Sequence, residues 1–126
     1  MKVARTGIGF DAHRFAPKRA LVLAGVEIEY DYGLAGHSDA DVIVHAVIDA
    51  LLGASGQRDI GWHFPPDDLR WKDVSSISLL GRIGEFLISK GFTVVNVDVI
   101  LIGEEPKIAG CIDQMRKNIS SALDID

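Results

Sequence analysis

The chain has 126 residues, of which 48% are hydrophobic and 25% charged, enough for one compact domain and too few for two. Its net charge of −5 excludes a broad basic surface, so nucleic acid is not an expected partner. The single Cys111 cannot form an internal disulfide, the N-terminus lacks a signal peptide, and no apolar stretch is long enough to span a bilayer. We therefore expect a cytoplasmic protein without a membrane partner.

Hydrophobic periodicity predicts six elements in the order strand, hairpin, helix, helix, strand, helix. In chain order these are a strand at 3–10, a hairpin at 20–30 that turns near Ala24 and Gly25, helices at 39–52 and 75–90, a strand at 92–102, and a helix at 108–123. We expect Ser38 or Asp39 to cap the first helix and Gly53 to end it. The order predicts an α+β fold, with helices packed on one face of a mixed β-sheet in a single domain over residues 1–126.

A long polar stretch separates the first two predicted helices. It spans residues 56–68 and contains glycine and two consecutive prolines. This is too long for a tight turn, so we interpret it as a functional or mobile loop.

Two polar clusters contain three of the four histidines. Asp11 and His13 follow the first predicted strand and lie on one face of the chain. His45 lies on the first helix, with Asp41 one turn before it and Asp49 one turn after it. A metal-binding imidazole is commonly oriented by a carboxylate or carbonyl on its second nitrogen, and Asp41 and Asp49 are the candidates.

Each feature alone has a simpler structural interpretation. An Asp-x-His pair at a strand end is more often a turn with a surface histidine, and His45 alone is more often an exposed helix residue. The combination of the two clusters favours a divalent metal site and metal-assisted chemistry.

Four runs of residues share a specific order and spacing: Gly9-Phe10-Asp11-Ala12-His13, His37-Ser38-Asp39-Ala40-Asp41-Val42 with His45-Ala46 behind it, Asp59-Ile60-Gly61-Trp62-His63-Phe64-Pro65, and Glu105-Pro106-Lys107-Ile108. With these runs the whole chain resembles the 2-C-methyl-D-erythritol 2,4-cyclodiphosphate synthase family. Ala12 and Ala40 stand where the family often has valine and glycine, and neither difference changes a functional group.

The resemblance implies a homotrimer with active sites between subunits. It also implies a lyase that cyclises 4-diphosphocytidyl-2-C-methyl-D-erythritol 2-phosphate to 2-C-methyl-D-erythritol 2,4-cyclodiphosphate and releases CMP, in the non-mevalonate isoprenoid pathway. The implied metals are a zinc ion held by Asp11, His13 and His45, and a second divalent ion, Mg²⁺ or Mn²⁺, that accompanies the substrate.

The resemblance further implies the residues that contact the substrate. His37 is the expected catalytic residue, as stabiliser of the transition state. His37 and Ser38 precede the first predicted helix, whose free amides and positive dipole end would favour a phosphate. The expected substrate-binding residues are Asp11, His13, His37, Ser38, Asp59, Ile60, Gly61, Phe64, Pro65, Pro66, Asp67 and Asp68, together with Gly103, Glu104, Glu105, Pro106, Lys107, Ile108 and Ala109 at the cytosine pocket of a neighbouring subunit.

Family members continue past the position of Asp126 with two strands that carry a Thr-Thr-Glu motif and a Gly-rich segment, and we expect this chain to lack them. The alternative is therefore a catalytically inactive module that holds zinc and binds a cytidine nucleotide. Replacing His37 discriminates the two, because only the synthase needs it for turnover. A general metal phosphohydrolase is disfavoured, because no residue is placed as an obvious base for water.

Overall fold

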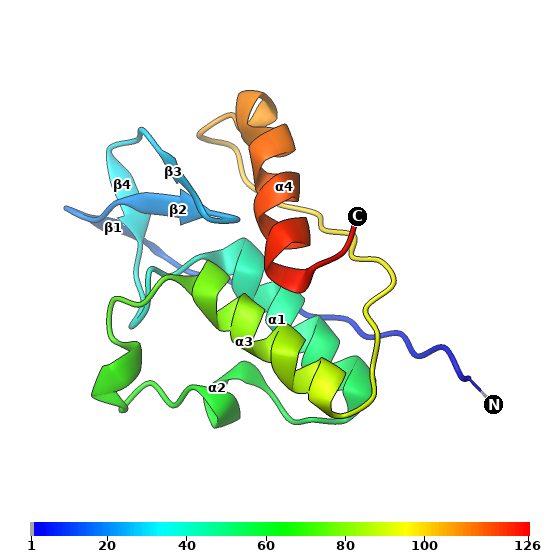
Figure 1. Ribbon diagram of the computed structural model, residues 1–126. Helices are drawn as coiled ribbons and strands as arrows, with labels where there is room; N and C mark the ends of the chain where they lie inside the picture. Colours follow the sequence, from blue (N-terminus) through cyan, green and yellow to red (C-terminus); the bar gives the residue numbers. More distant parts are fainter. Residues whose placement is uncertain (1) are drawn as a thin grey trace.

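The computed structural model describes residues 2–126 (Figure 1). The strands are β1 (Phe15–Pro17), β2 (Leu21–Leu23), β3 (Val26–Ile28) and β4 (Tyr32–Leu34), and the helices are α1 (Val42–Ser55), α2 (Ile60–His63), α3 (Ser76–Ser89) and α4 (Ile112–Leu123). Short 3-10 turns lie at Leu69–Trp71 and Ala109–Cys111. Among the described residues, every helix is too short or too polar to cross a membrane.

The N-terminal third forms two small antiparallel sheets. β1 pairs with β4, with Phe15 opposite Leu34, and β2 pairs with β3, with Leu21 opposite Ile28. The predicted hairpin is confirmed: its turn lies at Ala24 and Gly25, both with positive φ. Leu21 and Leu23 point into a hydrophobic cluster that also contains Ile43 and Met115.

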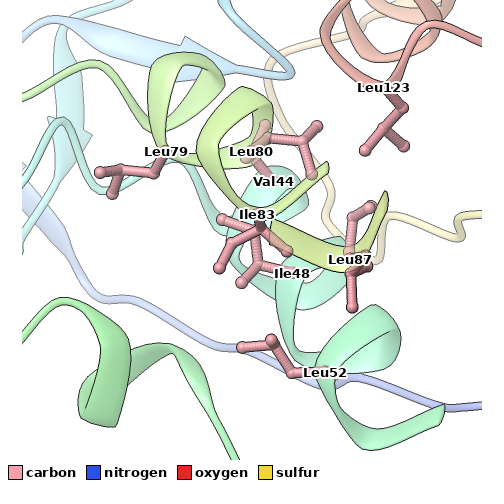
Figure 2. Packing of buried hydrophobic residues seen from close by; sticks show 9 residues of the cluster. Val44, Ile48, Leu52, Leu79, Leu80, Ile83, Leu87 and Leu123 are labelled. Atoms are coloured by element: carbon pink, nitrogen blue, oxygen red, sulfur yellow. The ribbon is translucent and has the colours of Figure 1, made fainter. Parts of the chain in front are cut away.

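The main core lies where α1, α3 and α4 meet, which confirms the three long predicted helices. Figure 2 shows the buried side chains of α1 and α3 facing one another, with Leu123 of α4 at the edge. Val44, Ile48, Leu52 and Leu80 have no exposed surface. These helices form the rigid support on which the polar clusters are carried.

The predicted ends of α1 are wrong by a few residues. Its N-cap is Asp41, whose carboxylate accepts the amide of Val44, in place of Ser38 or Asp39. Its C-cap is Gly56, in the left-handed conformation with φ 70°, in place of Gly53. The helix therefore begins after the polar motif that was expected to open it.

The expected mixed sheet is also wrong for the described residues. Residues 3–10 and 92–102 form no ladder there, and the fold is α+β with two small antiparallel sheets. The alternation of apolar residues predicts which side chains face the core, but a strand also needs a partner backbone. Phe92, Val94 and Val97 do pack on the core, whereas Val95 is 89% exposed and Ile100 84%.

Candidate metal centre and active site

Asp11, His13 and His45 lie together although the third is more than 30 positions from the first two. The Oδ2 atom of Asp11 lies 2.7 Å from Nε2 of His13 and 3.2 Å from Nδ1 of His45. One ligand atom from each residue lies within 4.8 Å of the others. All three side chains are partly buried. The predicted clustering of these residues is therefore confirmed.

A close approach of two backbones brings the pair 11–13 to α1. The segment that precedes Asp11 lies directly on the helix, and a Cβ atom on Gly9 would be only 1.9 Å from the carbonyl oxygen of Ala46. Only glycine allows this separation. Asp11 follows two residues later and so faces His45 on the same helix.

The ring of His13 is held by a backbone carbonyl. Its Nδ1 lies 2.7 Å from the carbonyl oxygen of Ala35, just after β4, and a carbonyl can only accept. In the neutral ring Nδ1 therefore carries the proton, which leaves the lone pair of Nε2 for a metal ion on the side of Asp11. This is the tautomer that a metal ligand needs.

The ring of His45 is oriented by serine hydroxyls. Its Nε2 lies 2.9 Å from Oγ of Ser76 and 3.1 Å from Oγ of Ser38, while its Nδ1 faces Asp11. Burial lowers the pKa of His45, and the carboxylate of Asp11 only partly opposes this. The imidazole is thus neutral near pH 7, as metal binding requires.

The two carboxylates expected to orient His45 have other roles, so that prediction is wrong. Asp41 accepts the amides of Ala24, Gly25 and Val44, and burial raises its pKa to about 6. Asp49 accepts the amide of Ile60 at 2.9 Å and joins α2 to α1. Helical spacing correctly put both residues about one turn from His45. Their carboxylates, however, accept hydrogen bonds from backbone amides and not from the His45 ring.

Sequence reasoning missed Ser76 as a partner of His45. The available signal was weak, a pair of serines before the apolar run of the second predicted helix. The contact depends on the tertiary packing of the start of α3 against the loop that precedes α1.

The donor set fits a divalent metal ion. One carboxylate and two imidazoles, with ligand atoms within 4.8 Å of one another, are the ligands typical of a catalytic zinc site, which keeps a further position for substrate. A purely structural zinc site commonly has four protein ligands. The arrangement can therefore hold a metal ion and leave room for a phosphate oxygen.

His37 and Ser38 lie in the loop before α1. The ring Nε2 of His37 lies 3.3 Å from the carbonyl oxygen of Asp68, and its own carbonyl accepts the amide of Asp73. The Ser38 side chain is buried against His45. The expected position of these two residues at the start of α1 is wrong, because α1 begins at Val42 and the Asp41 carboxylate accepts the amide of Val44 at its N-terminus.

The stretch 56–68, predicted as a loop, contains the short helix α2. Asp59 caps α2 by accepting the amide of Trp62 at 2.9 Å, and Phe64 packs edge-on against Trp71. Asp68 pairs with Arg70 at 2.7 Å, which lowers the pKa of Asp68. The segment is fixed to α1 at one end and to His37 at the other.

The segment 103–109 joins the exposed stretch before it to α4 (Figure 1). Lys107 donates to the carbonyl oxygen of Glu104, and the Glu105–Pro106 peptide bond is cis. Ile108 packs on the hydrophobic cluster to which β2, β4, α1 and α4 contribute buried residues. Within residues 2–126, no hydrogen bond or ion pair joins this segment to Asp11, His13 or His45.

The fold and donor set define a small α+β protein with a carboxylate-and-imidazole site for a divalent metal ion. The chain belongs to the YgbB family, whose model matches residues 4–126. The similarity extends across nearly the whole length of the chain.

Named relatives agree with this membership. The 2-C-methyl-D-erythritol 2,4-cyclodiphosphate synthase of Dehalococcoides mccartyi (strain CBDB1) is 51% identical over 122 residues, which cover 97% of this chain and 78% of the relative. The bifunctional IspDF of Campylobacter jejuni has a TM-score of 0.91 at 40% identity, over 97% of this chain and 33% of that one. A synthase structure described as a CDP-bound form has a TM-score of 0.89 at 32% identity, over 97% and 81%.

Proposed function

We propose that this chain cyclises 4-diphosphocytidyl-2-C-methyl-D-erythritol 2-phosphate to 2-C-methyl-D-erythritol 2,4-cyclodiphosphate with release of CMP. The observation that carries the proposal is the clustering of Asp11, His13 and His45, with ligand atoms within 4.8 Å of one another, in a chain about half identical to named synthases. The protein is accordingly a phosphorus–oxygen lyase of isoprenoid precursor synthesis.

The reaction needs no protein nucleophile. An oxygen of the 2-phosphate attacks the β-phosphorus, the bond from that phosphorus to the oxygen of the α-phosphate breaks, and CMP departs with the electron pair. Catalysis then consists of aligning the two ends of one molecule and neutralising charge on the phosphoryl oxygens. The partly buried ligand groups of the metal site are suited to this alignment and neutralisation of charge.

We assign the metal site to zinc, with a second ion, Mg²⁺ or Mn²⁺, bound together with the substrate. A bound divalent ion supplies neutralisation of phosphate charge. Asp11 supplies an anionic oxygen and the two histidines supply neutral nitrogens, so the ligands leave a net positive site. This excess positive charge favours a diphosphate ligand.

His37 is the proposed catalytic residue, and Ser38 is a proposed phosphate contact. His37 is tied to Asp68 through its ring, so movement of the segment 64–68 and exposure of the ring are coupled. The residues Asp59, Ile60 and Gly61 are the proposed contacts of the methylerythritol part, at the point where Asp49 anchors α2.

We also propose a homotrimer in which 103–109 completes the nucleotide pocket of a neighbouring copy. Apolar side chains on extended segments support association: Ile8 is 92% exposed, Phe10 83% and Ile102 89%. Large exposed apolar surfaces of this kind commonly mark protein interfaces. A structurally similar synthase described as a CDP-bound form supports a cytidine nucleotide as the ligand.

Phosphorus NMR of the protein with zinc, magnesium and the cytidyl substrate tests the proposal. We expect signals of the cyclic diphosphate and CMP to appear together. The His37→Gln variant should lose turnover and retain metal, while Lys117→Gln, exposed on α4, should behave like the wild type. Persistence of substrate with zinc bound to the wild type would refute the synthase and leave the inactive nucleotide-binding module.

A further inference from the structure

The orientation of His45 depends on a hydroxyl that the reaction itself does not use. Ser76 is the first residue of α3 and has no exposed surface. Its Oγ lies 2.9 Å from Nε2 of His45, on the side of the ring opposite the metal-facing Nδ1. A buried hydroxyl in this position can fix both the rotation and the tautomer of the ring.

Asp39 holds Ser76 through two separate hydrogen bonds. The backbone amide of Ser76 donates to Oδ2 of Asp39 at 2.9 Å, and the hydroxyl of Ser76 donates to Oδ1. The backbone of Asp39 is fixed in turn, because its amide donates to the carbonyl oxygen of Val74 at 3.1 Å. The hydroxyl thus has a defined position and a defined direction.

The direction of each proton follows from the chemistry of the groups. An ionised carboxylate only accepts, so the hydroxyl proton of Ser76 points to Asp39. The oxygen of Ser76 is then left as an acceptor for His45, which favours the proton of the neutral ring on Nε2. The lone pair of Nδ1 is then available to a metal ion on the Asp11 side of the ring.

We propose that Asp39 and Ser76 form a positioning relay that holds His45 in its Nε2–H tautomer and so presents Nδ1 to the metal ion. The inference rests on the proposed metal site. Ser38 assists from 3.1 Å, with its own oxygen also accepting the amide of Ala40. Neither Asp39 nor Ser76 is among the residues that would hold the metal ion, so both are positioning residues.

Ser76→Ala separates this role from a structural one. The variant removes the hydroxyl but keeps the backbone amide that ties α3 to Asp39. The matched control is Ser78→Ala on the same helix, where the serine is exposed and bonds only to the carbonyl of Ser75. Ser76→Thr restores a hydroxyl at the same branch point.

Zinc affinity, measured by competition with a chromophoric chelator, is the first readout. We expect Ser76→Ala to bind zinc about 10–100-fold more weakly than the wild type, Ser78→Ala to match it, and Ser76→Thr to recover part of the loss. Equal affinities of Ser76→Ala and Ser78→Ala would overturn the proposal. A wild type that binds no zinc would instead refute the metal site, so the two failures are distinguishable.

Nitrogen-15 NMR of the His45 ring is the second readout and needs no variant. In the zinc-loaded wild type we expect zinc on Nδ1 and the ring proton on Nε2. A proton on Nδ1 would overturn the relay even if Ser76→Ala failed to fold. The cobalt-substituted protein gives a third check, because a reoriented imidazole should change the visible absorption of Ser76→Ala and leave that of Ser78→Ala unchanged.

Discussion

Asp41 is a buried carboxylate whose ionisation should make the stability of the protein depend on pH. It has no exposed surface, and it accepts amides of the hairpin turn and of α1 at 2.7–3.1 Å. Burial outweighs these three hydrogen bonds and raises its pKa from 3.8 to about 6. The group therefore holds a proton in the folded state at a pH where the unfolded chain has lost it.

The sign of the effect follows from proton binding. Between about pH 4 and pH 6 the native state binds more protons than the unfolded state, so the free energy of unfolding falls as the pH rises. A shift of roughly two units corresponds to about 3 kcal/mol across this window. The contribution is fully present below about pH 4 and is lost above about pH 6.

The test is urea unfolding of metal-free wild type and Asp41→Asn at a series of pH values. Asparagine cannot ionise, so the stability difference between the two proteins should change by about 3 kcal/mol over the window. At low pH the free energy of unfolding of Asp41→Asn should still be about 1–3 kcal/mol below that of the wild type, because the side-chain NH2 group of the asparagine faces the backbone N–H of Gly25. Asp113→Asn, exposed on α4, is the control. Parallel curves for wild type and Asp41→Asn would refute this reasoning.

Three further outcomes are expected. Leu80→Ala, at a fully buried position between the helices, should lower the free energy of unfolding in urea by about 2–5 kcal/mol. Gly9→Ala forces the N-terminal segment off α1, and this overpacking costs about 1–3 kcal/mol, so zinc binding should weaken roughly tenfold. Gly110→Ala, with open space around the residue, should leave zinc binding unchanged. His13→Ala should abolish stoichiometric zinc, measured by metal analysis after dialysis, and a full complement of zinc in that variant would contradict the assigned ligands.

Local patterns predicted what depends on local physics. The hairpin at 20–30 and the three long helices follow from turn residues and from apolar spacing, and the structure contains them. The local pattern indicated only that the two polar clusters could together form a metal site, and the resemblance to the synthase family implied the particular set Asp11, His13 and His45, which the structure brings together.

Features that depend on contacts between residues far apart in the sequence were not predicted. Ser38, Asp39 and Asp41 are all good helix caps, and the hairpin turn decides between them, because its two free amides bind Asp41. The mixed sheet failed for the same reason: apolar alternation at 3–10 and 92–102 does not specify a ladder partner. The contact of Ser76 with His45 was not predicted because the two residues are 31 positions apart in the sequence.

The short loop before α1 couples metal binding to folding. Ser38 contacts His45, Asp39 grips the start of α3, and Asp41 holds the hairpin turn, so one loop joins the site to both hydrophobic clusters. Because a metal ion binds only the folded arrangement, saturating zinc should raise stability in proportion to the logarithm of its affinity. If Ser76→Ala binds zinc 10–100-fold more weakly, its free energy of unfolding should be about 1.4–2.7 kcal/mol lower than that of the wild type when zinc is present. When a chelator removes the zinc, this part of the difference should disappear. A purely structural role for Ser76 predicts the same loss in both conditions.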